Sequence, residues 1–366
     1  MNTDNLHQLI NRYEDNFELI NNATNDEIFK WRAVRCFQQV WFDDQYDGQS
    51  FSEKFRAATR ETSVLIDNGQ VSPANGIVKM AEQEPEEVER LFTEVLFADD
   101  AGDLELRQDH LDEFLDGIEA VRQRCFPSYW KYSQDRHSAF TYLALFAPEE
   151  NYIYKYSEAE EFAKCIEYGI DIGSGQNFKL AAYYGMCDLL VDELKEHPSL
   201  LEKHQAICGS DCYQDQSLHL LAFDVIYCAR AYNFYTGMTF ASKSDSIKAH
   251  KLGELRKKEQ EEKQAKVDAI ESEIRSLELR CAEIEQISLV NVQVQHKQYG
   301  TGIVISQETP KITVSFGDVT KSFIINKKFP ARPTFEADVE IVDAFTEYDA
   351  AVRQIGLLRK QLSLIN

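Results

Sequence analysis

Six apolar residues between positions 246 and 287 recur at alternating steps of three and four, and charged residues of both signs lie between them. They are Val267, Ile270, Ile274, Leu277, Cys281 and Ile284. This spacing is typical of the seam of a coiled coil, where the apolar stripe of one helix packs against a partner helix. The pattern therefore predicts a coiled-coil helix over residues 246–287, with parts of different character before and after it.

The part before this helix, residues 1–240, shows the period of amphipathic helices repeatedly. One such helix follows Thr24 and Glu27, a spacing at which the two side chains can cap a first helical turn. Its predicted inner face consists of Ile28, Trp31, Val34, Phe37, Val40 and Trp41. Residues 1–240 are therefore predicted to form a multi-helical domain, of one or two lobes.

After residue 287 the apolar positions alternate with polar ones, as in β-strands, and glycine or proline separates the runs. Several short strands in residues 288–335 predict a small closed barrel, because an open sheet of this size would leave unpaired edges. The last segment, residues 342–366, again shows a helical stripe. We predict that this helix pairs with the coiled-coil helix in an antiparallel hairpin, with the barrel inserted at its tip. The fold class is mainly α.

Charge is distributed unevenly along the chain. Residues 1–246 carry 21 basic and 44 acidic side chains, whereas residues 247–366 carry 18 of each. Within the predicted barrel, residues 288–335, the balance is +4. An acidic surface repels nucleic acid, so the barrel is the better candidate for binding it.

The sequence contains no run of about 18 apolar residues, and its first residues lack the pattern of a secretory signal. Most of the eight cysteines lie within apolar helical patterns, where cysteine behaves as a small hydrophobic residue in a reducing compartment. We therefore expect a cytoplasmic protein without membrane contact.

Residues 294–304, VQHKQYGTGIV, are followed by ITVSF at 312–316 and by KSF at 321–323. This pattern resembles the C-terminal Tudor-like domain of UvrD/PcrA-type helicases. The resemblance implies an SH3-like barrel that grips a protein partner and sometimes nucleic acid. The residues it offers for contact are His296, Tyr299, Lys321, Lys327 and Lys328. The alternative is that Tyr299 and Phe323 only fill the barrel.

Residues 29–38, FKWRAVRCFQ, together with the helix after Pro85 and YIYKY at 152–156, resemble helical N-terminal modules of McrB-type AAA ATPases. The resemblance implies a recognition domain in bacterial DNA surveillance or phage defence, although the sequence contains no G-x-x-x-x-G-K-S/T motif of an ATPase. The candidate contact residues are Lys30, Arg32, Arg35, Arg136 with the adjacent His137, and Tyr154. The alternatives are a solvated helix face for the basic residues and core packing for the tyrosines.

Four potential zinc ligands, His204, Cys208, Cys212 and His219, lie close together in sequence. Their spacing is unusual for a zinc site, so we expect no metal and no cofactor. The sequence predicts a non-catalytic recognition or adaptor protein that binds a protein partner, with DNA and a coiled-coil homodimer as further options. The alternative is a metal-dependent hydrolase whose site is assembled in the helical domain.

Overall fold

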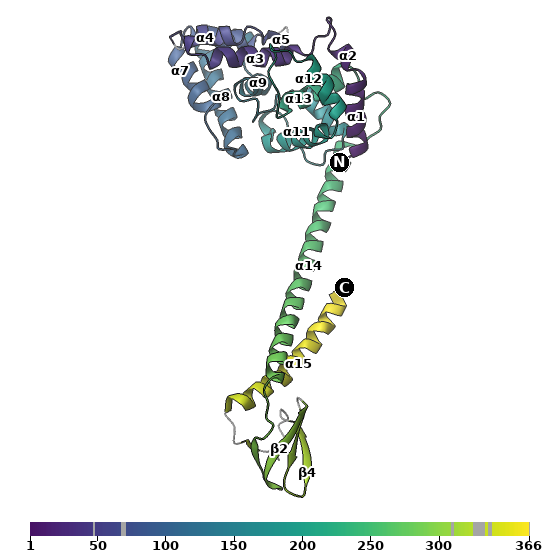
Figure 1. Ribbon diagram of the computed structural model, residues 1–366. Helices are drawn as coiled ribbons and strands as arrows, with labels where there is room; N and C mark the ends of the chain where they lie inside the picture. The colour runs from purple at the N-terminus through teal and green to yellow at the C-terminus, as the bar shows by residue number, and fades with distance from the viewer. Residues whose placement is uncertain (47, 67–70, 309–310, 325–333, 336–338, 366) are drawn as a thin grey trace. The chain divides into compact units, whose positions relative to one another are not determined.

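The computed structural model describes residues 1–46, 48–66, 71–308, 311–324, 334–335 and 339–365 (Figure 1). These residues are mainly helical, with fifteen α-helices and a small antiparallel sheet near the C-terminus, which confirms the predicted class. The chain divides into two compact units, Met1–Leu252 and Gly253–Asn366. The division lies within the longest helix, α14 (Lys243–Glu285).

Thirteen of the described helices precede α14 and form the first compact unit, called here the helical unit. They are α1 (Thr3–Asp15), α2 (Phe17–Ile20), α3 (Phe29–Trp41), α4 (Phe51–Ala58), α5 (Ser63–Ile66), α6 (Pro73–Ala81), α7 (Pro85–Arg90), α8 (Leu104–Cys125), α9 (Arg136–Phe146), α10 (Tyr156–Cys165), α11 (Leu180–Lys195), α12 (Pro198–Ile207) and α13 (His219–Ala231). Short 3₁₀ turns occur at Asp44–Tyr46, Trp130–Tyr132 and Gly175–Asn177, and α7 continues into a π-helical turn, Leu91–Leu96.

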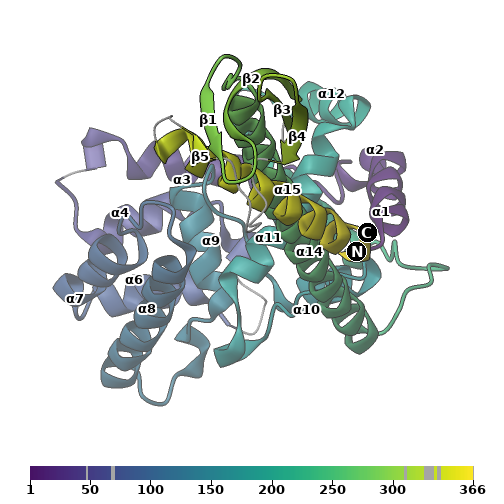
Figure 2. The same ribbon diagram turned by 90° about the horizontal axis from the view of Figure 1, so that it is seen from below.

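The helices of this unit share one continuous hydrophobic core. Helices α3 to α9 pack as one group, in which α3 contacts α4 and α9. Helix α13 contacts α1, α10 and α11 in a second group, and α8 connects the two groups through α11. Figure 2 shows α4, α6, α7 and α8 on one side of the unit and α1, α2 and α12 on the other.

Helix α3 buries the apolar stripe that its sequence predicts, including Trp31, Val34 and Phe37. The predicted cap is wrong, because α3 begins at Phe29 and no side chain caps it. The Glu27 carboxylate instead accepts a hydrogen bond from the Lys30 ammonium. A local capping motif has therefore given way to a charge pairing in the core.

The sheet of the second unit has the strand order β4-β3-β2-β1-β5, and all its pairings are antiparallel. The strands are β1 (Gln293–His296), β2 (Gly300–Glu308), β3 (Lys311–Ser315), β4 (Thr320–Ile324) and β5 (Thr334–Phe335). Gly300, with a φ of +75°, closes the β1–β2 turn. At Gly302 a Cβ atom would lie 2.5 Å from the Phe316 ring, so glycine lets that ring pack on the strand. Closure of this sheet into a barrel stays a prediction.

The last helix, α15 (Val339–Ile365), runs beside the C-terminal half of α14 in both views (Figures 1 and 2). Hydrogen bonds join Tyr348 to Glu285, Arg280 to Glu347, Gln354 to Glu273 and Arg359 to Glu278. From the Tyr348–Glu285 pair to the Gln354–Glu273 pair the residue number rises along α15 and falls along α14, and Figure 1 draws the two helices running in opposite directions, so they are antiparallel.

None of the helices formed by the described residues combines the length and the apolar character needed to cross a bilayer.

Candidate functional site

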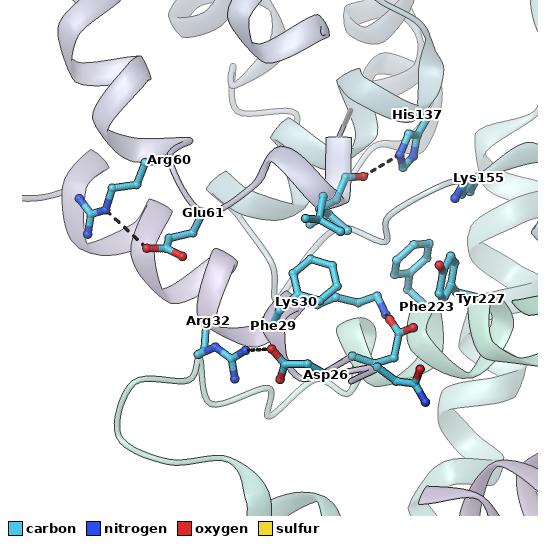
Figure 3. Close-up of a pocket in the computed structure, with 14 residues that line it drawn as sticks. Asp26, Phe29, Lys30, Arg32, Arg60, Glu61, His137, Lys155, Phe223 and Tyr227 are labelled. Carbon is cyan, nitrogen blue, oxygen red and sulfur yellow. Dashed lines mark hydrogen bonds and ion pairs between the residues drawn. The ribbon is translucent and has the colours of Figure 1, made fainter. Parts of the chain in front are cut away.

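The helical unit contains a cavity of about 550 Å³ between α3, the segment around α5, α9 and α13 (Figure 3). It is lined by Asn25, Asp26, Glu27, Phe29, Lys30, Arg32, Arg60, Glu61, Val64, Leu65, His137, Lys155, Phe223 and Tyr227. Cavities of this size commonly hold small ligands. The structure thus brings His137 to the same cavity as Lys30 and Arg32, which lie far earlier in the chain.

The floor of the cavity is a buried charge cluster. The Lys30 ammonium donates to the carboxylates of Glu27 and Asp224, and Lys30 is only 2% exposed. Tyr13 donates to the second oxygen of Asp224 at 2.6 Å, and Tyr232 donates to Glu27 at 3.1 Å. Burial alone would lower the pKa of Lys30, but the nearby carboxylates, chiefly Asp224, outweigh burial and raise it. Lys30 therefore stays charged and belongs to no exposed basic surface.

Three further cations, Arg32, Arg60 and Lys155, line the cavity. Arg32 donates to Asp26 at 2.5 Å on the exposed side, while Arg60 lies 3.8 Å from its neighbour Glu61. The ammonium of Lys155 lies 4.9 Å from the centre of the Tyr227 ring and 3.7 Å from Glu158.

The cavity lining is richer in basic side chains than the rest of the helical unit. Four basic residues face three acidic ones there, whereas residues 1–246 as a whole have 21 against 44. With Asp224 paired to Lys30, the charges at the cavity are nearly balanced, whereas the unit as a whole is acidic.

His137 fixes the rim of the cavity between two backbone segments. Its ring nitrogens lie 2.8 Å from the carbonyl oxygen of Tyr154 and 2.9 Å from that of Leu65. These contacts tie α9 to α5 and to the extended segment before α10. Lys155 follows Tyr154 directly, so the same contacts hold Lys155 beside the cavity.

The other predicted contact residues of the helical unit lie elsewhere. Arg35 is exposed on α3 and does not line the cavity. Arg136 donates to Asp112 at 2.6 Å and to the carbonyl of Gly175 at 2.8 Å, and it packs over Phe178. The side chain of Arg136 is therefore engaged with other residues of the helical unit.

The three alternating tyrosines do not share an exposed face. Residues 151–155 form no regular strand, and Tyr152 and Tyr154 are buried among other rings, such as Tyr183 and Tyr184. Tyr156 is exposed and begins α10. Burial raises the pKa of Tyr154 above its usual value. Tyr152 and Tyr154 are therefore core residues, as the alternative interpretation of the sequence had it.

The four potential zinc ligands do not form one group. The His204 ring packs at a tilt against Trp31, with ring centres 4.5 Å apart, and lies 3.6 Å from the sulfur of Cys208. His219 instead contacts the carbonyl of Pro148 at 3.2 Å. Cys212 is buried, and burial raises its thiol pKa. Across the part of the chain that the structure describes, no group of three or more histidine, cysteine or acidic side chains is arranged to hold a metal ion.

The sheet of the second unit carries a cluster of four rings, called here the aromatic cluster: His296, Tyr299, Phe316 and Phe323. His296 and Tyr299 stack with centres 4.8 Å apart, and Tyr299 lies 5.4 Å from Phe316. His296 is buried, whereas the other three rings are half-buried. The exposed Lys321 places its ammonium 5.8 Å from the Tyr299 ring centre. Lys327 and Lys328 lie outside the described residues.

No family model, no curated protein and no solved structure matches this chain.

Three residues were not predicted from the sequence: Asp224, which binds Lys30, and the cavity residues Arg60 and Lys155. Asp224 lies within the apolar pattern of α13 and is fully buried there, so an acidic residue in a buried helix was the one available signal. Arg60 and Lys155 stand alone in sequence, and only the fold brings them to the same cavity.

Proposed function

We propose that this chain is a non-catalytic recognition protein whose C-terminal sheet docks a protein partner. The observation that carries the proposal is the aromatic cluster, in which three rings remain half-exposed beside the Lys321 ammonium. Partly exposed aromatic rings combine a large contact area with few rotatable bonds, and they are enriched at protein interfaces. The resemblance to Tudor-like domains of UvrD/PcrA-type helicases and the predicted closure into a barrel belong to the same proposal.

The charges of the sheet favour a partner segment with apolar and acidic side chains. Lys297, Lys311 and Lys321 are all exposed, while Glu308 and Asp318 are the acidic residues of 288–324. The lysines of the sheet would attract an acidic segment, and the acidic helical unit would repel it. Such a segment is therefore expected to bind the sheet. By the McrB-type resemblance we place the protein in the bacterial cytoplasm, in DNA surveillance or phage defence.

Binding of the partner protein is expected to depend on Tyr299 and Lys321. In crosslinking pull-downs from the native host, the full chain should retain a specific protein that the Tyr299→Ala/Lys321→Glu variant loses. The matched control is Lys311→Glu, which changes the same charge on the opposite face of the sheet, since Lys311 pairs with Ile324 and Lys321 with Val314.

Two results would contradict docking of a protein. One is a retained partner that both variants keep equally. The other is binding of a labelled DNA duplex that weakens steeply with salt and is lost with Lys321→Glu, which would assign the sheet to nucleic acid. Backbone NMR or circular dichroism of each variant establishes that the sheet is still folded.

We also propose that α14 and α15 mediate self-association. Leu357 and Leu364 lie seven residues apart on one face of α15 and are 63% and 80% exposed, and Leu279 of α14 is also exposed. Apolar residues at this spacing favour a further helix partner. Light scattering is expected to give the mass of two chains for the wild type and of one chain for Leu357→Glu/Leu364→Glu. A wild-type monomer at tens of micromolar would refute this pairing.

A further inference from the structure

We propose that His137 is a pH-dependent latch on the wall of the cavity, which holds α5 when its ring is doubly protonated and releases α5 when the ring is neutral. Leu65 of α5 is one of the two residues that the ring contacts, and Lys155 directly follows the other. Both Leu65 and Lys155 line the cavity together with His137 (Figure 3). The inference rests on the helical unit alone, so it is independent of the docking surface on the sheet.

Both ring nitrogens of His137 face hydrogen-bond acceptors. Nδ1 lies 2.8 Å from the carbonyl oxygen of Tyr154, and Nε2 lies 2.9 Å from that of Leu65. A carbonyl oxygen accepts hydrogen bonds but donates none, so each contact needs a hydrogen on the ring nitrogen. A neutral imidazole carries one such hydrogen, whereas the imidazolium carries two. The pair of contacts is therefore complete only in the charged ring.

A neutral ring can keep only one of the two contacts, because its second nitrogen would turn a lone pair toward the lone pairs of a carbonyl oxygen. The contact with Tyr154 is the better supported one. Tyr154 is buried, and the Tyr183 hydroxyl holds the same segment by donating to the carbonyl of Ile153 at 2.6 Å. Helix α5 has only four residues, too few for a helix to be stable by itself. Loss of the proton is therefore expected to free the Leu65 carbonyl and to make α5 open more often.

The charges around His137 largely pair with one another. Arg136 pairs with Asp112, Lys30 with Glu27 and Asp224, Arg32 with Asp26, Arg60 with Glu61, and Lys155 with Glu158, while Asp135 caps α9. Burial raises the pKa of Tyr154 and of Tyr227, so both phenols stay neutral. Among the described residues no carboxylate forms an ion pair with His137 itself. The two carbonyl oxygens are thus the groups that distinguish the charged ring from the neutral one.

Acid is expected to favour the latched state. The latched ring binds one more proton than the released ring, so the latched population rises as the pH falls. An ordinary histidine takes up its proton near about pH 6.5, which places the change in the neutral range. This direction is opposite to that of His204, whose pKa is lowered by burial and whose protonation opposes folding. The two histidines can therefore be told apart by sign.

The test is hydrogen exchange of the full chain at pH 6 and pH 8, expressed as protection factors so that the intrinsic pH dependence of exchange is removed. The amides of Leu65 and Ile66 report on α5, because both donate to the carbonyl of Thr62 at 3.0 Å. We expect their protection to be about tenfold higher at pH 6 than at pH 8, as for one hydrogen bond from a charged donor. The amide of Phe126, which bonds to Arg122 at the end of α8, should show no such change.

Two variants separate the latch from other pH effects. His137→Gln keeps a donor but cannot take up a charge, so the protection of α5 should be low and equal at both pH values. The matched control is His7→Gln. His7 is exposed on α1, bonds to Glu193 at 2.7 Å and does not line the cavity, so α5 should respond to pH in this variant as in the wild type. Circular dichroism confirms that each variant is folded.

Nitrogen-15 NMR of the histidine rings in the wild type gives a second readout that needs no folded variant. Both His137 nitrogens should carry a proton at pH 6, and only one should at pH 8. Three outcomes would overturn the latch. The first is wild-type protection of α5 that is equal at the two pH values. The second is a pH response that folded His137→Gln retains. The third is a His137 ring with the same number of protons at pH 6 and pH 8.

Discussion

Replacing Lys30 with methionine is expected to lower the free energy of unfolding of the helical unit by about 3–5 kcal/mol. The methionine fits the same space, but it leaves the carboxylates of Glu27 and Asp224 without their cation. Asp224 is fully buried, so water cannot replace the lost partner. Breaking a buried ion pair by removing one member costs more than the pair itself contributes, because the remaining charge stays desolvated.

The measurement is urea unfolding followed by tryptophan fluorescence. All three tryptophans, Trp31, Trp41 and Trp130, belong to the helical unit, so the signal reports this unit alone. The control is Lys79→Met, which breaks an exposed pair with Glu82 and should change stability by less than about 1 kcal/mol. Adding Glu27→Gln and Asp224→Asn to Lys30→Met should restore much of the loss. A Lys30→Met variant within 1 kcal/mol of wild type would contradict the expected role of the cluster.

Acid is expected to destabilise the helical unit through His204, by up to about 3 kcal/mol between pH 6.5 and pH 4. Burial, partly opposed by the charge of Asp224, lowers the pKa of His204 to about 4. In the unfolded chain the ring takes up a proton near pH 6.5, whereas in the folded chain it stays neutral until about pH 4. The unfolded state therefore binds more protons in this window, so stability falls as the pH falls and levels off below pH 4.

The comparison that isolates this effect is His204→Phe, which keeps a ring against Trp31. Urea unfolding at pH 7.5, 6, 5 and 4.5 should give a flatter pH dependence for the variant than for the wild type. The difference in free energy of unfolding between the two proteins at pH 7.5 reports the change in packing. Only the change of this difference with pH reports the protonation of His204. Parallel curves for the two proteins would show that His204 is not the group responsible.

Much of the fold follows from periodicity in the sequence. The heptad residues of α14 gave the right helix, since Ile274, Cys281 and Ile284 are buried in it. The alternation after residue 287 predicted strands, and β1 and β3 place Val294, Ile312 and Val314 in one small core. In β2 the alternating residues Ile303 and Ile305 are both exposed, and Val304 between them is buried instead, so the predicted phase of this strand is wrong. In both cases the pattern of apolar residues is local, and local patterns are what a single sequence shows directly.

Only part of the candidate site could be predicted from local patterns in the sequence. Lys30, Arg32 and Arg35 were predicted as a basic cluster for contact, but Lys30 is buried and donates to Asp224. Asp224 lies 194 residues further along the chain, so the local sequence does not reveal this partner. The same distant pairing redirects Glu27 from the predicted helix cap. Such contacts depend on the packing of α3 against α13, and no spacing within either helix encodes them.

The exposed middle of α14 has a consequence for how the chain unfolds. Residues 251–266 are all exposed, and the two hydrophobic cores lie on either side of them in sequence. A helical stretch with no buried side chain couples the unfolding of the two parts that it joins only weakly. Heat or denaturant should therefore melt the chain in two separate steps, and a single melting temperature would describe neither half.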